Sequence, residues 1–97
     1  MNIKILPFAN DDLLNGYYFY EQQEKGIGSY FLDSLFSDID SLLLYQSIHP
    51  VVFNRYYRLL SKRFPFAIYY NIEYEDIIVY AVLDCRKEPA WIEGRLE

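Results

Sequence analysis

The first half of the chain carries apolar residues at helical spacing, interrupted by polar ones. The first such stretch predicts a helix over residues 11–24, with Asn10 as its N-cap and Gly26 as its C-cap. Gly16 weakens this helix by roughly 1 kcal/mol relative to alanine, which indicates close packing of a neighbouring element. The apolar face of the helix is predicted to comprise Leu13, Tyr17 and Tyr20.

A second amphipathic stretch begins at Gly28 or Ser29 and predicts a helix that runs to about Gln46, before Pro50. Its apolar positions are Phe31, Leu35, Ile39 and Leu42, and the opposite side carries Asp33, Ser37, Asp40 and Ser41. Such a wide apolar stripe predicts packing on both a sheet and the first helix. Because the link between the helices is short, we expect an antiparallel helical hairpin.

The remaining apolar stretches predict strands over residues 3–8, 55–62, 64–73 and 77–84. Pro7 cannot donate a ladder hydrogen bond, so the first strand is expected either to lie at a sheet edge or to end there. Phe66, Ile68, Tyr70 and Ile72 alternate along the third strand and are expected to share one face. Residues 73–76 connect the last two strands. The order β-α-α-β-β-β predicts an α+β fold, with a helical hairpin packed on a small, mainly antiparallel sheet.

Composition indicates one folded domain over residues 1–97. The chain is 53% hydrophobic and 20% aromatic, and its apolar runs are too short to span a membrane. It does not begin with a signal-peptide pattern, and its only cysteine is Cys85. These features predict a cytoplasmic protein.

Although the formal net charge is -5, basic residues gather in the second half of the chain. One group has no acidic residue between its members, and a second follows the last strand; together they are Arg55, Arg58, Lys62, Arg63, Arg86 and Lys87. We expect these cations to converge on one end of the sheet, where they would bind a phosphate or the carboxylates of a partner. The alternative is a solvated rim with salt bridges to Asp84 and Glu88.

Other candidates for chemistry are few. His49 is the only histidine, stands next to Pro50 and has no acid or cysteine cluster around it, so no metal site is predicted. Cys85 has no histidine near it in the sequence and is expected to be a small, partly buried side chain. Without a glycine-rich phosphate loop or a hydrolase motif, the sequence predicts no cofactor.

An ordered set of short motifs resembles the toxin subunits of RelE/ParE-type bacterial toxin–antitoxin systems. The set comprises Phe8-Ala9-Asn10-Asp11-Asp12-Leu13, Tyr17-Tyr18, Gly28 followed by Phe31, RFPFAIYY over residues 63–70, IIVYAVLDCRKEPAWI over residues 77–92, and Arg95. The resemblance covers nearly the whole chain. It implies a RelE/ParE toxin-like domain, associated with plasmid stabilization, that an antitoxin neutralises by wrapping the helices and sheet.

The resemblance leaves the target open, because RelE-like members cut mRNA on the ribosome whereas ParE-like members inhibit DNA gyrase. An RNase needs a base, an acid and cations, and this chain offers Arg63, Arg86 and Lys87 as cations. Many relatives carry histidine where this chain has Asp84, and its last tyrosine is Tyr80. We therefore favour a ParE-like toxin. The alternatives are a ribosome-dependent mRNA endonuclease and a degenerate, non-toxic member that only binds its antitoxin.

Antitoxin binding is predicted at the tyrosines of the first helix, Tyr17, Tyr18 and Tyr20. An exposed stripe of tyrosine and leucine suits an amphipathic partner helix, and aromatic anchors often dominate such interfaces. Some of the three are expected to face the partner, because all of them cannot fit into the core. The alternative for each is an aromatic core position with a solvated hydroxyl group.

Overall fold

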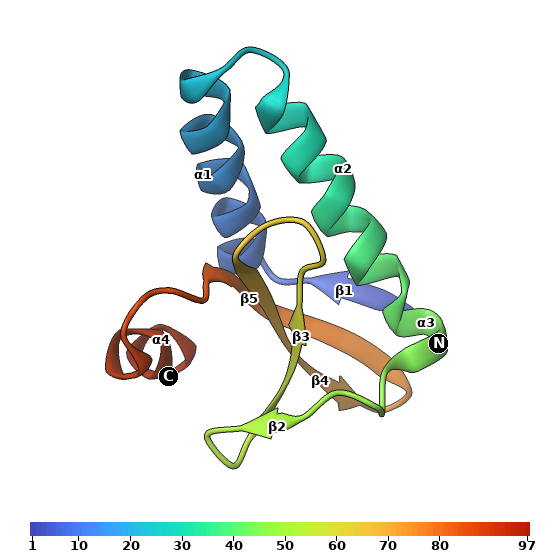
Figure 1. The fold of residues 1–97 in the computed structure, drawn as a ribbon. Coiled ribbons are helices and arrows are strands. Elements are labelled where there is room, and N and C mark those ends of the chain that lie inside the picture. The colour runs from blue at the N-terminus through green and yellow to red at the C-terminus, as the bar shows by residue number, and fades with distance from the viewer.

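The computed structural model describes all residues from Met1 to Glu97 and contains a five-stranded sheet with helices on both faces (Figure 1). The strands lie in the order β1-β5-β4-β3-β2; β1 pairs with β5 in parallel, and the other pairs are antiparallel. The elements along the chain are β1 (Ile3–Ile5), α1 (Pro7–Gln23), α2 (Ile27–Asp40), α3 (Leu42–Tyr45), β2 (Val51–Val52), β3 (Tyr56–Leu60), β4 (Phe66–Glu73), β5 (Asp76–Asp84) and α4 (Pro89–Leu96).

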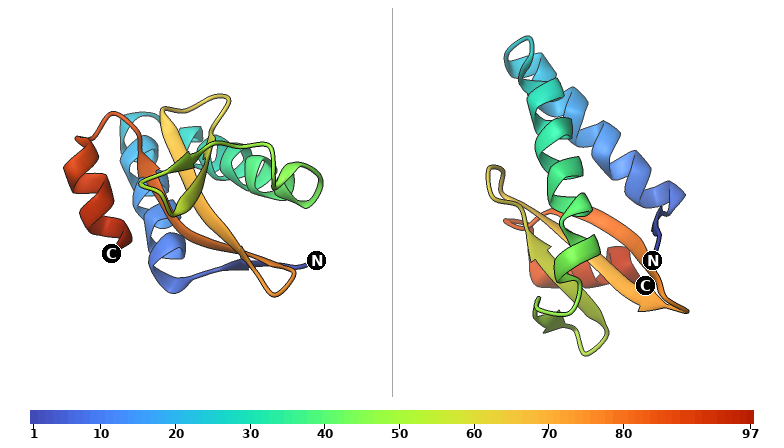
Figure 2. Two further views of the ribbon diagram at one scale, coloured as in Figure 1. Left: turned by 90° about the horizontal axis from the view of Figure 1, so that it is seen from below. Right: turned by 90° about the vertical axis from the view of Figure 1, so that its right-hand side faces the viewer.

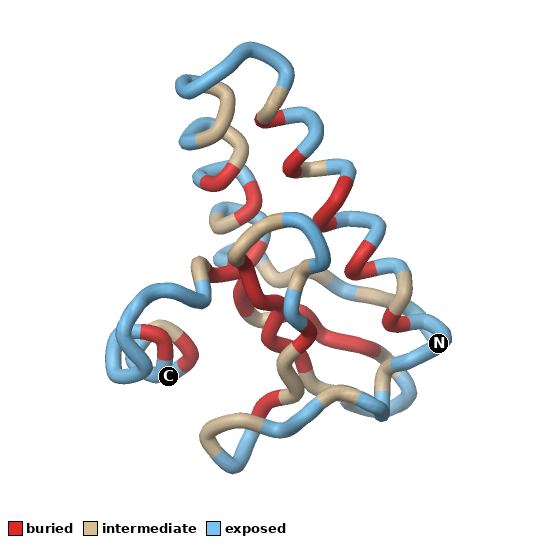
Figure 3. Tube along the Cα trace, in the orientation of Figure 1, coloured by how far each residue is buried: buried red, intermediate tan, exposed pale blue.

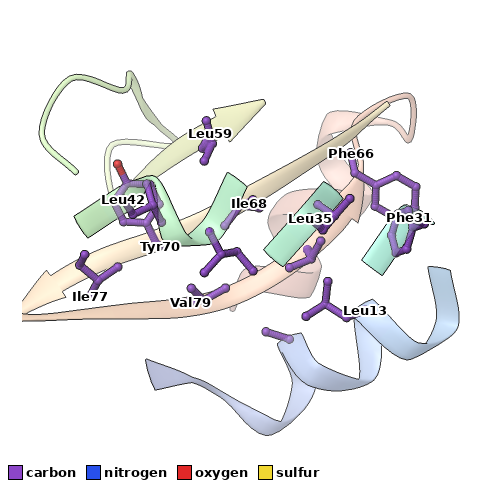
Figure 4. Close-up of a cluster of buried hydrophobic side chains, with 13 residues drawn as sticks. Leu13, Phe31, Leu35, Leu42, Leu59, Phe66, Ile68, Tyr70, Ile77 and Val79 are labelled. Atoms are coloured by element: carbon purple, nitrogen blue, oxygen red, sulfur yellow. The ribbon is translucent and has the colours of Figure 1, made fainter. Parts of the chain in front are cut away.

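The helical hairpin of α1 and α2 covers one face of the sheet, which we call the hairpin face, and its tip extends beyond the strands (Figures 1 and 2). The core on this face has 13 buried residues drawn from α1, α2, α3 and the three central strands (Figure 4). Phe31, Leu35, Ile39 and Leu42 are all at most 1% exposed, which confirms the predicted stripe. Figure 3 shows how burial alternates along α2 with the helical repeat.

Gly16 allows the close helix packing that the sequence suggests. A Cβ atom at this position would lie 2.4 Å from Cζ of Phe31, closer than any two carbon atoms can approach without a bond. Phe31 therefore fills the space that a side chain at Gly16 would need. Glycine is used here for its size.

The short helix α4 covers the opposite face of the sheet, which we call the α4 face. Ile92 and Leu96 pack there in a second core of seven buried residues. Two polar contacts hold the helix in place. The Tyr56 hydroxyl donates to the Leu96 carbonyl oxygen at 2.8 Å, and Arg95 pairs with Asp12 of α1 at 2.5 Å. The pattern-based prediction did not include this helix.

The predicted caps of the first helix are wrong. The helix begins at Pro7, with Leu6 as its N-cap, because proline suits the first helical turn, where an amide is not needed for the ladder. Asn10 therefore lies inside the helix. Gly26 is not the C-cap, which is Glu24; with φ at 96° it is instead the N-cap of α2. The Glu21 carboxylate accepts hydrogen bonds from the amides of Gly26 and Gly28, and so closes the hairpin turn.

The second predicted helix is also too long. It ends at Asp40, and α3 follows after Ser41, whose hydroxyl group donates to the Asp38 carbonyl oxygen at 2.6 Å. Serine commonly competes with the helical ladder in this way. The first strand ends at Ile5 but lies at the sheet edge, as expected. The next three predicted strands differ from β3, β4 and β5 by one or two residues at some ends, and the two-residue edge strand β2 was not predicted.

A β-bulge changes which face each residue of β5 occupies. Tyr69 pairs with Ala81 and Tyr70 with Val79, which leaves Tyr80 as the extra residue. Consequently Val79 and Val82 both reach the hairpin face, while Ala81 and Leu83 reach the α4 face. An extra residue of this kind shifts the two-residue alternation by one position.

Candidate functional site

The most distinctive polar region lies where the β3–β4 link meets the end of β5. Phe66 pairs with Asp84 in the sheet, and the Cys85 amide donates to the Pro65 carbonyl oxygen at 2.9 Å. These contacts bring Arg63 and Arg86 to the same end of the sheet, as the sequence led us to expect. The link itself lies beside α2 (Figures 1 and 2).

Aromatic rings separate the two arginines at this end. The Phe64 ring lies between the rings of Tyr20 and Tyr30, with centroid distances of 4.9 Å and 5.6 Å. The Arg63 guanidinium group lies over the Tyr30 ring, 5.7 Å from its centroid. Burial raises the pKa of Tyr20, and the nearby Arg86 cation partly offsets that effect. The result is a mixed aromatic and cationic surface that can contact either a protein or a nucleobase.

Arg86 is already paired with Asp84. Its Nε and Nη2 atoms donate to the two carboxylate oxygens at 3.0 Å and 2.7 Å, and its amide donates to the same carboxylate at 2.9 Å. Hydrogen bonding by the Arg86 side chain holds the pKa of Asp84 below its ordinary value. Asp84 is consequently a weak base, and the Arg86 charge is largely compensated.

The other predicted cations do not all join this site, which corrects the expectation of a single cluster. Lys62 lies with Arg63, and both line a cavity against α2. Lys87 turns toward α4, where its ammonium nitrogen lies 5.4 Å from the centroid of the Trp91 ring. Arg55 precedes β3 and therefore lies at the opposite end of that strand, over the Tyr56 ring.

Arg58 is separated from the site by the sheet itself. It pairs with Tyr69 across the β3–β4 ladder, and Tyr69 is a core residue of the α4 face. The Nε atom of Arg58 is buried without a hydrogen-bond partner. Its place in the strand directs Arg58 to the α4 face, whereas Lys62 and Arg63 follow the end of β3 and lie against α2, so cations that are near one another in the sequence do not all converge.

Apart from Cys85, which is next to Asp84, the other titratable side chains of interest lie away from this end of the sheet. The Tyr80 hydroxyl group donates to the Glu73 carboxylate, and this bond raises the pKa of Tyr80 to about 12. Burial lowers the pKa of His49, whose ring meets Tyr70 edge-on. Cys85 is exposed, which corrects its expected partial burial. No group of three potential metal ligands gathers anywhere in the structure.

The three predicted antitoxin-binding tyrosines have different environments. Tyr18 is 59% exposed, whereas Tyr20 packs on the core, with its ring centroid 5.3 Å from that of Phe31. Tyr17 is half-buried and packs against Gly28. If residue 28 had a side chain, its Cβ atom would lie only 2.8 Å from the Tyr17 ring. The sequence did not single out Phe8 and Phe19, which are 72% and 54% exposed on the same helix. Their outward positions depend on the rotation of α1 on the sheet.

Sequence reasoning also missed the polar side chains of α2 that face inward. Ser34 and Asp38 are buried, although the predicted polar side of this helix was elsewhere. The available signal was their spacing: Ser34, Asp38 and Ser41 follow one another at i, i+4 and i+7, beside the apolar stripe.

None of the helices is long and apolar enough to cross a membrane. No protein-family model matches the chain, and neither does any curated protein sequence. Among solved structures, the chain is similar to one from the chromosomal ParDE TA (toxin–antitoxin) system from P. aeruginosa. The two share 17% sequence identity and a TM-score of 0.77 over 84% of this chain and 92% of that chain. The expected RelE/ParE-like α+β fold is thereby confirmed.

Proposed function

We propose that this protein is the toxin subunit of a bacterial type II toxin–antitoxin system and acts by binding a protein target such as DNA gyrase. The observation that carries the proposal is the fold, which follows a chain of a ParDE system over 84% of this protein. The ordered motifs of the sequence support the same assignment independently. Fold alone does not set an activity, so the choice of target rests on the side chains.

The side chains at the Arg63–Arg86 end favour binding over RNA cleavage. Attack by a 2′-hydroxyl group needs a base near neutral pH and an acid for the leaving oxygen. The Asp84 carboxyl group has a lowered pKa and is held by Arg86, while the pKa of Tyr20 is raised. Neither group is suited to exchange a proton at neutral pH. An aromatic surface flanked by cations instead fits an acidic protein partner.

A ribosome-dependent mRNA endonuclease is the second candidate, because Arg63 and Arg86 do lie at one end of the sheet. In that mechanism the two guanidinium groups would stabilise the charge that develops on the phosphate. Arg86 would first have to leave Asp84. Arg63, which has no acidic partner, is the more available of the two.

The proposed partner in the cell is an antitoxin that covers the outer side of α1. Tyr18 is the most accessible of the predicted anchors, and Leu14, one turn earlier, is 43% exposed. An amphipathic segment of the antitoxin could pack on this pair and on Phe19. Tyr17 and Tyr20 would then act indirectly, by fixing the position of α1.

Controlled expression in a bacterial host tests the proposal. We expect a growth defect that co-expression of a cognate antitoxin relieves, and inhibition of supercoiling by purified gyrase. Cleavage of ribosome-bound mRNA by the purified protein, lost in both Arg63→Ala and Arg86→Ala, would establish the nuclease instead. Lys25→Ala, an exposed cation at the hairpin tip, is the matched control. The absence of any growth defect would contradict both and support a degenerate antitoxin-binding member.

A further inference from the structure

A polar cavity separates α2 from the β3–β4 link. Its volume is ≈ 200 Å³, and no apolar residue lines it. The six lining residues are Ser34, Ser37, Asp38, Ser41, Lys62 and Arg63. A cavity of this size and lining suits a small polar ligand rather than an apolar side chain.

The inner wall of the cavity contains two polar residues that are more than nine-tenths buried. Asp38 is 7% exposed, and one of its carboxylate oxygens accepts a hydrogen bond from the Ser61 hydroxyl group at 2.8 Å. Ser34 is 8% exposed, and its hydroxyl group has no partner within the protein. Buried polar groups are normally satisfied by the protein, by water or by a ligand, so the unpaired Ser34 hydroxyl group at the cavity wall leaves one hydrogen bond for an occupant of the cavity to supply.

The outer wall carries two cations. Lys62 and Arg63 are exposed, and neither takes part in an ion pair with an acidic side chain. Two cations and one carboxylate give the cavity a net positive charge. An anionic ligand is therefore favoured, provided that it can also donate a hydrogen bond to Asp38.

We propose that this cavity binds a phosphate group that retains a P–OH bond, as in inorganic phosphate or the singly protonated form of a terminal phosphate monoester. Lys62 and Arg63 bind the anionic oxygens, and the Ser34 hydroxyl group donates to one of them. The P–OH group donates to Asp38. Hydrogen bonding of this kind turns the buried carboxylate from a source of repulsion into an acceptor.

Asp38 makes the site selective. Sulfate and the phosphodiesters inside a nucleic-acid strand have the same tetrahedral oxygens but no hydroxyl group to donate, so Asp38 repels them. The site is thus distinct from a surface that follows a nucleic-acid backbone. The argument for the cavity uses neither the fold likeness nor the target of the proposed toxin, although Arg63 belongs to both the cavity and the proposed target-binding surface.

Calorimetric titration of the purified protein with inorganic phosphate and with sulfate, at equal ionic strength, tests the proposal. We expect phosphate to bind at least about tenfold more tightly, as loss of a hydrogen bond to a charged group implies. A 5′-phosphorylated oligonucleotide, compared with the unphosphorylated strand at a pH below about 6, where the terminal phosphate keeps a P–OH group, distinguishes a nucleic-acid end from free phosphate as the source. Equal binding of phosphate and sulfate, or no phosphate binding, would overturn the proposal.

Single substitutions link the binding to these residues. Arg63→Ala and Lys62→Ala should each weaken phosphate binding by about tenfold, whereas Arg55→Ala, at the other end of β3, should leave it unchanged. Asp38→Asn should abolish the preference for phosphate over sulfate. Ser34→Ala removes a buried hydroxyl group that has no protein partner, so it should weaken phosphate binding while the protein remains as stable as before. Unchanged phosphate binding in Ser34→Ala would contradict the assignment even if Asp38→Asn failed to fold.

Discussion

The two faces of the sheet are stabilised in different ways. On the hairpin face, 13 buried residues interlock, and α1 and α2 meet so closely that Gly16 leaves room only for the Phe31 ring. On the α4 face, seven buried residues form a smaller core, and an eight-residue helix is held by two polar contacts. A helix this short is marginal by itself, so its stability depends on those contacts. We therefore expect the hairpin face to set global stability and α4 to open first.

The largest loss of stability on the hairpin face should come from removing the Phe31 ring at the centre of its core. Phe31 is fully buried and touches Tyr20, Phe64 and Phe66, so Phe31→Ala should lower the free energy of unfolding by about 3–5 kcal/mol. Urea denaturation measures the change. Phe36→Ala, on the 39% exposed outer side of the same helix, should cost much less. Similar losses for both variants would refute the asymmetric packing of α2.

Removing Arg95 should weaken the attachment of α4 to the sheet. Burial raises the pKa of Asp12 even though Arg95 and the Val82 amide donate hydrogen bonds to it, so this carboxylate depends on its partners. Arg95→Ala should cost about 1.5–3 kcal/mol. Hydrogen exchange should show faster opening of the α4 amides, with the α2 amides protected as before. Lys25→Ala serves as the control for loss of one positive charge, and equal exposure of both helices would argue against independent opening.

Two glycine substitutions should change stability in opposite directions. Gly16→Ala forces a Cβ atom into the Phe31 ring and should destabilise the protein by about 1–3 kcal/mol. Gly94→Ala, in α4, meets no atom within 4 Å and should stabilise the protein by up to about 1 kcal/mol through helix propensity. Thermal unfolding of the two variants beside the parent protein gives both signs. A stabilising Gly16→Ala would mean that the helices do not pack as closely as described.

The smallest expected effect concerns the Tyr80–Glu73 contact beside the α4 face. The hydrogen bond to Glu73 raises the pKa of Tyr80 from its ordinary value of 10.0 to about 12. The stabilisation that this contact gives to the folded state is therefore fully present below pH 10 and is lost as the pH rises toward 12. Glu73→Gln should move the Tyr80 pKa back toward 10 and reduce this alkaline loss. Ultraviolet titration of tyrosinate measures the shift, and Glu75→Gln in the adjacent turn is the control. An unchanged titration in Glu73→Gln would exclude the hydrogen bond.

Elements with a regular repeat of apolar residues could be predicted from the sequence, whereas helix ends and helix α4 could not. The apolar stripe of α2 and the long strands β4 and β5 could be predicted because their residues repeat at helical or strand spacing. The ends of α1 and α2 could not, since Pro7 and Ser41 act through local backbone geometry. Helix α4 was missed because its burial depends on Tyr56 and Asp12, which lie far away in the sequence.

The candidate site was predicted in part. Register explains why Arg63 and Arg86 lie at the same end of the sheet, because the β4–β5 hairpin brings the start of one strand beside the end of the other. Strand alternation explains why Arg58 does not join them. The inward-facing Ser34 and Asp38 were missed because their polar chemistry contradicts the usual rule for a buried helix face.

The sequence by itself determined the α+β class, the helical hairpin and the family that the chain resembles. These features arise from the spacing of residues that are near one another along the chain. Only the tertiary structure decided which cations share a site, which tyrosines face outward and that a polar cavity lies behind Arg63. Those outcomes depend on register, on the bulge at Tyr80 and on the rotation of each helix, and such long-range geometry is fixed only when the elements pack together.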